Sequence, residues 1–460
     1  MRIAFIDLNK GIRVGEPNIG ILELMSYLKT RKNISMVLFD NPSKIIKNWQ
    51  GFDVLAFSSM GFPLEKFIES GNAKRIKKIP RLKVIGGPGA SILPRKGLEF
   101  SDIVVRGEGE IPFLNLLTLL EEKNLSADKT LEVLGAIELF NIENLIFKDS
   151  GCIRETKSRV YEPSEIDISK IDWRLMRSIP DYIKKWPYLA YLSSVRGISL
   201  VSSRSCPFNC AFCQPTIKDM FGPKIKYKKI DYIVEELLFL KRNFKINSFM
   251  FHDDTFTLDS KRVSDFCERL IDLRRKGVVF NWVCNTRAET LTLALAKKMR
   301  DAGCLEVRLG IETFDEGRRN SILNKGLSDK DIIKAIQIIH ESDMKALGFF
   351  MIGLPSQTFK HILREIVWIS KSDLDLASVS VFTPIPGTYL GKKYSIESYD
   401  SYYHTNKNKV SDLNGMVLDF LRISAILFFY FNPKRIILTT KQLFSPRTLL
   451  YNFKRFSGFS

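Results

Sequence analysis

The sequence predicts an α/β protein with two successive parallel sheets, each built from short apolar strands that alternate with amphipathic helices. Two observations predict this fold class. Strand and helix patterns alternate over residues 1–125 and again over residues 196–390. In both regions the strands are continuous apolar runs, which is typical of parallel strands that are buried on both faces.

The first region contains five predicted strands and the helices that connect them. One helix has apolar residues at positions i, i+3, i+4 and i+7, which form a single face; these are Ile21, Leu24, Met25 and Leu28. Another helix is expected over Leu64–Ile76. The predicted strands are Arg2–Leu8, Ser35–Phe39, Val54–Phe57, Leu82–Ile85 and Asp102–Val105. Because strands and helices alternate, we expect a Rossmann-like parallel sheet over residues 1–135.

The regular alternation is lost over residues 136–195, where Pro163, Pro180 and Pro187 interrupt the pattern. Proline fixes one backbone dihedral angle and lacks an N–H donor, so it disfavours the interior of helices and strands. We therefore expect a linker over residues 136–195, with a hairpin at Leu145–Arg154.

Alternation resumes over residues 196–390, where about six strand–helix units fit the pattern. Strands are predicted at Ser248–Phe251, Val279–Cys284, Glu306–Ile311, Leu347–Ile352 and Ser378–Phe382. Units of this kind and number form an open, partial (β/α)6 barrel of the TIM type, whose working residues lie at the carboxyl ends of the strands. Residues 391–460 are expected to form a small, basic, helical extension.

Composition limits the possible classes of function. Lys and Arg outnumber Asp and Glu by 70 to 51, which gives a net charge of +19. We attribute this excess mainly to a lysine-rich surface, because no compact patch of arginine and aromatic residues indicates a nucleic-acid partner. The first residues do not resemble a secretory signal, and no apolar run is long enough to span a membrane. We therefore expect a cytoplasmic protein with reduced thiols.

Three of the seven cysteines form a compact group with the spacing C-x3-C-x2-C: Cys206, Cys210 and Cys213. Thiolates are soft ligands that suit iron–sulfur clusters and zinc. A structural zinc site needs four ligands, and the next candidates along the chain, His252 and Cys267, lie far away. A 4Fe–4S cluster held by three thiolates leaves one iron open to a small molecule. The spacing favours such a cluster; a zinc knuckle or buried thiols are the alternatives.

This segment resembles the signature of the radical S-adenosylmethionine (SAM) superfamily, whose three cysteines follow the first barrel strand. The resemblance implies that the open iron binds the amino and carboxylate groups of SAM. It also implies that an external reductant, such as flavodoxin or ferredoxin, drives cleavage of SAM to methionine and a 5′-deoxyadenosyl radical. Phe212, just before the third cysteine, matches an aromatic residue that packs near the adenine.

Further motifs follow in the order that the superfamily shows. His252-Asp253-Asp254 closes the second strand, where many members have Gly-Gly-Glu. We therefore expect Asp253 or Asp254 to bind the SAM ammonium group, with a helix cap as the alternative. The resemblance places further SAM contacts at the ends of the next three strands: Asn285, Arg287, Arg308, Glu312 and Gly353. Ser356-Gln357 departs from the more common Gly-Glu at this point.

Three strand ends of the first domain carry small or acidic residues. Carboxyl ends of strands form the ligand crevice of a doubly wound sheet, although tight turns would also explain the glycines. Residues 1–125 resemble the cobalamin-binding domains that are fused to radical SAM barrels. The resemblance implies cobalamin contacts from Ser58, Ser59, Gly86, Gly87, Pro88, Gly107, Glu108 and Glu110. No histidine precedes residue 252, so this domain lacks a histidine ligand for the cobalt.

The C-terminal extension holds an apolar segment, Met416–Phe431, within a basic stretch. From His404 onward, nine Lys or Arg residues stand against two Asp residues. We expect the apolar segment to pack at the barrel mouth; peripheral membrane contact through residues 416–460 is the alternative. The expected substrate is a small molecule, and membrane contact would favour a lipid-like one.

Together these features predict a radical SAM enzyme that uses cobalamin to transfer a methyl group to an unactivated carbon. One alternative is a cobalamin-assisted radical cyclisation, rearrangement or oxidation without methyl transfer. Another is a protein that is not an enzyme, namely an iron–sulfur or zinc-binding electron carrier or adaptor, which the barrel motifs disfavour. The sequence identifies no catalytic side chain.

Overall fold

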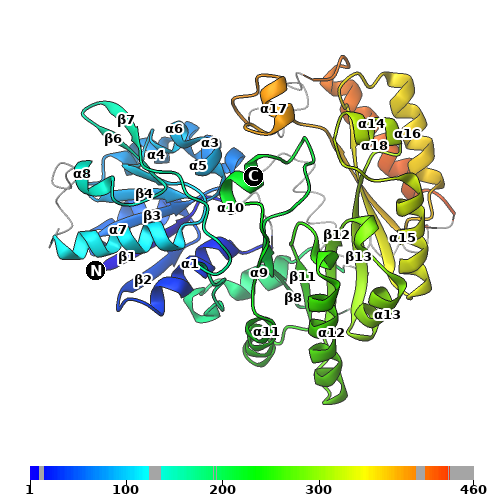
Figure 1. The fold of residues 1–460 in the computed structure, drawn as a ribbon, viewed down its shortest axis with the longest axis horizontal. Coiled ribbons are helices and arrows are strands. Elements are labelled where there is room, and N and C mark those ends of the chain that lie inside the picture. The colour runs from blue at the N-terminus through cyan, green and yellow to red at the C-terminus, as the bar shows by residue number, and fades with distance from the viewer. Residues whose placement is uncertain are drawn as a thin grey trace. The chain divides into compact units, whose positions relative to one another are not determined.

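The computed structural model describes residues 1–9, 15–123, 136–189, 191–192, 194–399, 410–433 and 435. The chain forms two compact units (Figure 1). The first unit comprises residues 1–13, 17–179 and 216–232, and the second comprises residues 14–16, 180–215 and 233–460. Residues 216–232, which were expected within the barrel, therefore belong to the first unit.

The first unit contains a seven-stranded sheet in the order β2-β1-β3-β4-β5-β6-β7. β1 to β5 run parallel, and β6 and β7 form an antiparallel hairpin at one edge. The strands are β1 Arg2–Asp7, β2 Ser35–Phe39, β3 Val54–Ser58, β4 Leu82–Gly86, β5 Ile103–Val105, β6 Leu145–Asp149 and β7 Cys152–Glu155. The order 2-1-3-4-5 is that of flavodoxin-like doubly wound sheets, which confirms the predicted class of this domain.

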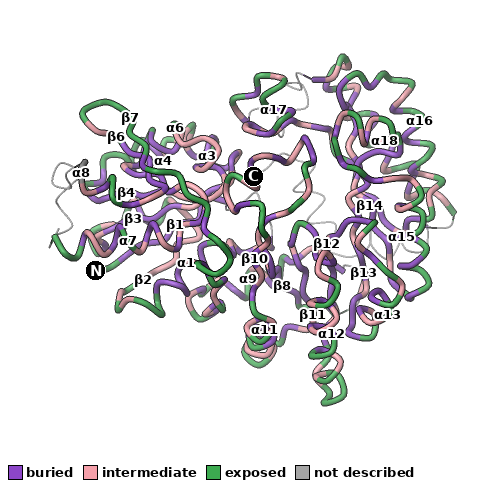
Figure 2. The backbone as a smooth tube through the Cα atoms, viewed as in Figure 1, coloured by how far each residue is buried: buried purple, intermediate pink, exposed green. Residues whose placement is uncertain are grey.

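Helices cover both faces of this sheet because successive residues of a strand point to opposite sides. In β1, Ile3 and Phe5 pack with residues of α1 and α7, whereas Ala4 and Ile6 pack with residues of α2, α3 and α4. The helices are α1 Ile19–Lys29, α2 Pro42–Asn48, α3 Gly61–Glu69, α4 Gly71–Lys77, α5 Pro88–Ile92, α6 Pro94–Gly97, α7 Glu110–Glu122 and α8 Ala136–Leu139. Figure 2 shows that the central strands are buried.

Two features of the first unit differ from the sequence-based expectations. The helix expected over Leu64–Ile76 is two helices, because Ser70 has an extended backbone between α3 and α4 and its hydroxyl donates to the Phe67 carbonyl at 2.7 Å. The expected linker over residues 136–195 contains β6 and β7, which confirm the predicted hairpin. Because β6 pairs with β5, this part of the segment belongs to the first sheet.

The second unit contains a six-stranded, parallel sheet in the order β15-β14-β13-β12-β11-β8. The strands are β8 Gly197–Leu200, β11 Ser248–Phe251, β12 Asn281–Thr286, β13 Cys304–Glu312, β14 Lys345–Ile352 and β15 Leu376–Val381. Each strand pairs with the next one along the sheet, and β8 and β15 form opposite edges. The sheet is thus the predicted open (β/α)6 barrel, and the carboxyl ends of its strands lie along one rim.

The helices that connect these strands are α11 Ile230–Phe244, α12 Ser260–Arg275, α13 Leu293–Asp301, α14 Glu316–Ser321, α15 Asp329–Glu341 and α16 Phe359–Lys371. After the last strand follow α17 Tyr389–Lys393 and α18 Gly415–Tyr430. The shorter elements of both units are α9 Ile179–Lys185, α10 Thr216–Phe221, β9 Ser203–Arg204, β10 Lys226–Tyr227, η1 Trp49–Gly51, η2 Trp173–Leu175, η3 Phe256–Leu258 and η4 Ala288–Thr290. The core beneath α12 is aromatic: Phe266 of this helix is buried against Phe249, Phe251 and Trp282.

The apolar segment expected at the barrel mouth forms α18. This helix packs against α16 and β15, and its Tyr430 bonds Ala377 near the amino end of β15, so the expectation that the segment packs at the mouth is wrong. None of the described helices is long and apolar enough to cross a bilayer. Residues 400–409 and 436–460 of the extension lie outside the described residues.

Candidate active site

The three clustered cysteines lie in the loop that follows β8 and β9, next to the rim of the second sheet. Cys210 is buried, and Cys206 and Cys213 are partly buried. The Cys210 carbonyl accepts hydrogen bonds from the backbone N–H groups of Cys213 at 3.0 Å and Gln214 at 2.9 Å. The N–H group of Ala211 donates to the carbonyl of Leu323 at 2.8 Å. These backbone bonds hold the loop in one shape, so the spacing of the cysteines becomes a defined arrangement of sulfurs.

The surroundings of Cys206 and Cys213 favour the neutral form of these two thiols. Burial raises the pKa of the Cys206 thiol and the charges of Asp254 and Cys210 add to this effect. Burial also raises the pKa of Cys213, together with the charges of Asp254, Cys206 and Cys210. Among the described residues, no three His, Cys, Asp or Glu side chains surround a position that would suit one metal ion.

Arg287, the residue after β12, contacts the cysteine loop directly. Its side chain is buried, and one terminal nitrogen donates to the Cys210 sulfur at 3.4 Å. The guanidinium lies 3.8 Å from the centre of the Phe208 ring and also donates to Glu289 and to the Lys325 carbonyl. The sequence predicted Arg287 as a SAM contact, which stays a prediction; the structure brings it to Cys210, a predicted cluster ligand.

Replacing Arg287 by glutamine should lower the reduction potential of a cluster on this loop. Hydrogen bonds to cluster sulfurs and nearby positive charge both raise such potentials, and the substitution removes the positive charge. We expect a normal iron content with a lower midpoint potential in an anaerobic redox titration followed by electron paramagnetic resonance. Arg275→Gln, which changes an exposed arginine, is the matched control. An unchanged potential in Arg287→Gln would mean that Arg287 only packs against the loop.

The two aspartates after β11 have different environments. Asp253 is buried and accepts hydrogen bonds from the Ser202 N–H at 2.6 Å, the Ser202 hydroxyl at 2.6 Å and the Ser203 hydroxyl at 2.7 Å. Asp254 remains accessible to solvent, although crowding by protein atoms and the charge of Asp253 raise its pKa to about 7. Asp253 therefore ties the ends of β8 and β11 together, which leaves Asp254 as the candidate for a ligand.

Two neighbouring residues of β12 and β13 extend the site. Asn285 and Arg308 are partners in the register of these strands. The side-chain oxygen of Asn285 is buried and has no hydrogen-bond partner in the described structure, which is an arrangement expected where a bound molecule donates. Arg308 instead pairs with Glu306 at 2.6 Å and lies 4.4 Å from the ring centre of Tyr188. Asn285 therefore fits the predicted role of a ligand contact better than Arg308 does.

Glu312 ends β13 with a backbone φ of 70° and forms a buried ion pair with Lys325 at 2.9 Å. The same lysine nitrogen lies 5.7 Å from the centre of the Phe212 ring. Phe212 packs against an apolar cluster that includes Leu323 and Leu354. Sequence analysis missed Lys325, because no motif marks a lysine that meets its partner only in the folded chain.

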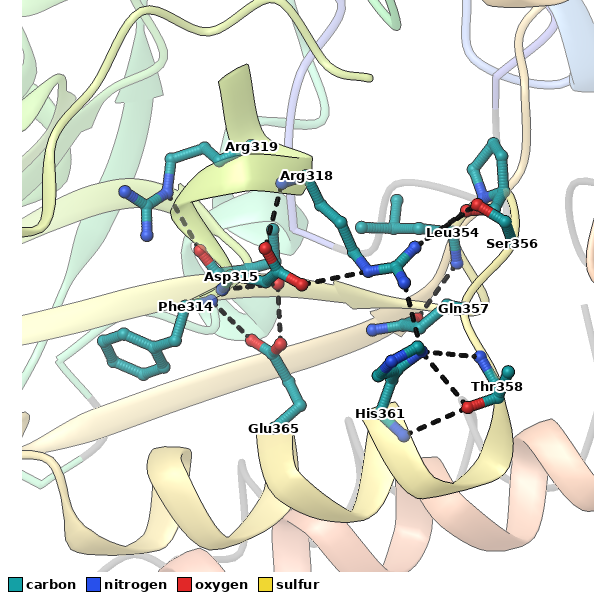
Figure 3. Close-up of polar contacts among 12 residues, drawn as sticks. Phe314, Asp315, Arg318, Arg319, Leu354, Ser356, Gln357, Thr358, His361 and Glu365 are labelled. Atoms are coloured by element: carbon teal, nitrogen blue, oxygen red, sulfur yellow. Dashed lines mark hydrogen bonds and ion pairs between the residues drawn. The ribbon is translucent and has the colours of Figure 1, made fainter. Parts of the chain in front are cut away.

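A polar network holds the loops after β13 and β14 (Figure 3). Gln357 accepts from the N–H groups of Gly353 at 2.8 Å and Leu354 at 3.1 Å, so the glutamine that replaces the more common glutamate still orders this loop. Arg318 bridges Asp315 to the Pro355 carbonyl and to His361. Glu365, on α16, accepts from the Thr313 hydroxyl at 2.6 Å and the Phe314 N–H at 2.7 Å.

Glu365 should make the stability of the second unit depend on pH. Burial raises its pKa from 4.5 to about 7. Between these values the folded protein keeps a proton that the unfolded chain has lost, so the free energy of unfolding falls as the pH rises through this window. In denaturant titrations we expect the free energy of unfolding to fall by roughly 2–3 kcal/mol in total from pH 4.5 to 7, and Glu365→Gln to remove this pH-dependent fall. Glu341→Gln, at an exposed position, should keep the slope; an unaltered slope in Glu365→Gln contradicts the assignment.

The predicted cobalamin contacts lie at the carboxyl ends of strands in the first unit, but several already have partners within the chain. Gly87 has a φ of 88°, and a Cβ atom there would lie 2.9 Å from the Ser58 hydroxyl and the Ser59 carbonyl. The Ser59 hydroxyl donates to the Met60 carbonyl at 2.8 Å. Glu108 forms a fully buried ion pair with Lys226. Gly86, Pro88, Gly107 and Glu110 lie in or beside the turns that end β4 and begin α5 and α7.

Sequence analysis missed a polar group where the strand order of the first sheet reverses, between β1 and β3. Asp7 accepts from the side-chain amides of Asn9 and Asn18, both at 2.9 Å. The Asn18 amide also lies 3.5 Å from the Ser58 hydroxyl, and the Asn9 oxygen accepts from the Met60 N–H at 2.8 Å. Ligands of doubly wound sheets bind at this reversal, so position in the topology was the signal that could have identified these residues.

The chain is similar to known proteins. Residues 200–369 match the family model of the radical SAM superfamily. An uncharacterized methyltransferase of Pyrococcus horikoshii is 29% identical over 385 residues, which cover 81% of this chain and 77% of that protein. The anaerobic magnesium-protoporphyrin IX monomethyl ester cyclase of Cereibacter sphaeroides is 28% identical over 319 residues, which cover 67% of this chain and 48% of the cyclase.

A solved structure shows a similar fold. The radical SAM methyltransferase TsrM from Kitasatospora setae, with cobalamin and a 4Fe–4S cluster bound, matches 94% of this chain and 86% of its own chain with a TM-score of 0.68. The two sequences are 14% identical, so this match shows a shared fold alone.

Proposed function

We propose that this chain, which carries a radical SAM domain over residues 200–369, is an enzyme that holds a 4Fe–4S cluster on Cys206, Cys210 and Cys213. The observation that carries the proposal is the cysteine loop itself, whose three thiols lie at the rim of an open (β/α)6 barrel. When bound, the cluster would supply the electron that cleaves SAM to methionine and a 5′-deoxyadenosyl radical. The protein's part is to hold the sulfurs, place SAM and keep water away.

The residues around the loop fit a SAM molecule beside the cluster. The buried, unpartnered oxygen of Asn285 can accept from a SAM group, and Asp254 offers an accessible carboxylate near the thiols. A carboxylate bound to the SAM ammonium would form a charge-assisted hydrogen bond. Asp253 already accepts three hydrogen bonds, so we assign the ammonium contact to Asp254.

We further propose that the first unit binds cobalamin and that the reaction is methyl transfer to an unactivated carbon of a small molecule. The support is the flavodoxin-like strand order of this unit and the fold shared with a cobalamin-bound methyltransferase. The polar group at the β1/β3 reversal, centred on Asp7, lies where such sheets bind ligands. An external reductant would supply the electrons.

A second candidate is a cobalamin-assisted ring closure without methyl transfer. The observation that favours it is the 28% identity to an anaerobic cyclase over 67% of this chain. This chain spans about half of the cyclase, so the activity of the whole cyclase is not carried over. Products separate the candidates, because methyl transfer converts SAM to S-adenosylhomocysteine and ring closure does not.

The experiment that tests the proposed function measures SAM cleavage without substrate. Protein reconstituted anaerobically with iron and sulfide is reduced with dithionite and incubated with SAM. We expect 5′-deoxyadenosine and methionine in equal amounts, and Asp254→Asn should bind SAM about tenfold or more weakly than the unchanged protein. Asp253→Asn should lower stability rather than SAM affinity. A reconstituted cluster with no 5′-deoxyadenosine under any condition would contradict the proposal.

A further inference from the structure

Exposed apolar side chains gather on two adjacent helices of the second unit. In the described part of the chain, sixteen large hydrophobic side chains are exposed, and ten of them lie on α16, on α18 or just after α18. Those of α16 are Phe359, Leu363, Val367 and Trp368; those of the α18 region are Met416, Phe420, Ile423, Leu427, Phe428 and Phe431. Because α16 and α18 pack side by side, we treat these residues as one surface, the α16–α18 face.

The spacing of these residues forms regular stripes. Phe359, Leu363 and Val367 follow one another at four-residue intervals along α16, so they share one side of the helix. Met416 and Phe420 continue the pattern on α18 and are 69% and 65% exposed. A helix with two apolar sides normally buries both; here one side of each helix packs inward and the other faces solvent.

The inner sides of the two helices are firmly held. On α18, Leu418, Leu421, Ala425 and Phe429 are buried. The Tyr430 hydroxyl donates to the Ala377 carbonyl at 3.2 Å, and the Arg435 guanidinium donates to the Leu374 carbonyl at 2.8 Å. On α16, Glu365 bonds the loop after β13 (Figure 3). The α16–α18 face is therefore presented by an anchored scaffold.

Positive charge accompanies the apolar stripes. Lys360, Arg364 and Lys371 are exposed on α16, and none of them forms an ion pair with a described residue. The acidic residue of α16, Glu365, is buried, and the acidic residue of α18, Asp419, is paired with Arg422 at 3.3 Å. The α16–α18 face thus combines large apolar side chains with cations whose charge is not neutralised by neighbouring acids.

We propose that the α16–α18 face rests on an anionic lipid surface. Large apolar groups beside Lys and Arg are typical of helices that lie in a membrane interface without spanning it. The positive charge of the face disfavours two other occupants, which are residues 436–460 of this chain and a second copy of the same face. Residues 436–460 carry four Lys or Arg residues and no acidic residue, and a second copy of this face would bring like charges together. This proposal concerns location and does not depend on the proposed chemistry.

Vesicle flotation of the full chain under anaerobic conditions tests the proposal. The probes are vesicles of phosphatidylcholine alone and of phosphatidylcholine mixed with phosphatidylglycerol. We expect flotation with the anionic vesicles. Lys360→Gln with Arg364→Gln should weaken binding roughly 30-fold, since each cation near an anionic surface adds severalfold affinity. Leu363→Ser with Phe420→Ser should weaken it on the order of a hundredfold.

The matched controls lie on α15, outside the α16–α18 face. Ile333 is 56% exposed and Lys334 is also exposed, so Ile333→Ser with Lys334→Gln makes similar chemical changes elsewhere and should float like the unchanged protein. Failure of the unchanged protein to bind anionic vesicles would overturn the proposal. So would a dimer that Leu363→Ser with Phe420→Ser converts to a monomer, or vesicle binding that appears only after deletion of residues 436–460.

Discussion

Replacing Cys206, Cys210 and Cys213 together by alanine is expected to remove iron and sulfide from the reconstituted protein and to abolish SAM cleavage. The three thiols are the only protein ligands that the proposal gives to the cluster, and SAM cleavage requires its electron. We expect iron and sulfide to fall to the background of a protein without a cluster. The loss of 5′-deoxyadenosine is expected to be complete within detection, measured by chromatography after anaerobic incubation.

Other cysteines of the chain supply the control for this prediction. Cys152 is exposed, whereas Cys267, Cys284 and Cys304 are buried. Cys152→Ala removes a thiol without disturbing the core, so iron, sulfide and SAM cleavage are expected to stay at their original levels. If the triple variant kept a full complement of iron and sulfide, the assignment of the cluster to this loop would be wrong.

Replacing Lys226 by methionine is expected to cost the first unit about 3–5 kcal/mol of its free energy of unfolding, because it leaves the Glu108 carboxylate buried without its partner. Both side chains of this pair are 1% exposed. Lys226 also donates to the Phe221 carbonyl at 2.8 Å. A chemical denaturation curve, followed by circular dichroism, measures the loss.

Two further variants make this prediction specific. Lys226→Met combined with Glu108→Gln removes both charges, so it should recover much of the lost stability. Lys224→Met breaks an exposed pair with Glu162 at 2.9 Å and is expected to cost less than about 1 kcal/mol. If Lys226→Met and Lys224→Met lowered the free energy of unfolding equally, burial of the Lys226–Glu108 pair would not determine how much this pair stabilises the protein.

This ion pair also bears on the sequence-based expectation for Glu108. The sequence marks Glu108 as a strand-end carboxylate that could meet cobalamin, but its partner is 118 positions away. Lys226 and Lys228, which pairs with Glu23 at 2.9 Å, hold residues 216–232 within the first unit. Local patterns do not report such distant pairs, and for this reason sequence analysis assigned the segment to the barrel.

Features that depend on local periodicity could be predicted. The alternation of Ile3 and Phe5 with Ala4 and Ile6 places helices on both faces of the first sheet, and apolar runs marked every long strand. The cysteine spacing likewise identified its loop without knowledge of the fold. These signals repeat within a few residues, so the backbone geometry of one element is enough to interpret them.

Features that depend on which strands become neighbours could not be predicted. The sequence left Asp253 and Asp254 equivalent, and only the hydrogen bonds from Ser202 and Ser203 separate them. Similarly, Arg287 meets the Cys210 sulfur across 77 residues. In both cases the side chain's partner decides its role, and that partner is brought close by the sheet order.

The measurement that tests the central claim most directly is anaerobic reconstitution of the full chain with iron, sulfide and hydroxocobalamin, followed by desalting and quantitation of all three. The account predicts about four irons, about four sulfides and about one corrin retained per chain. A cluster retained without corrin would contradict the cobalamin assignment and leave radical SAM chemistry alone. Zinc bound in place of iron and sulfide would contradict the account as a whole.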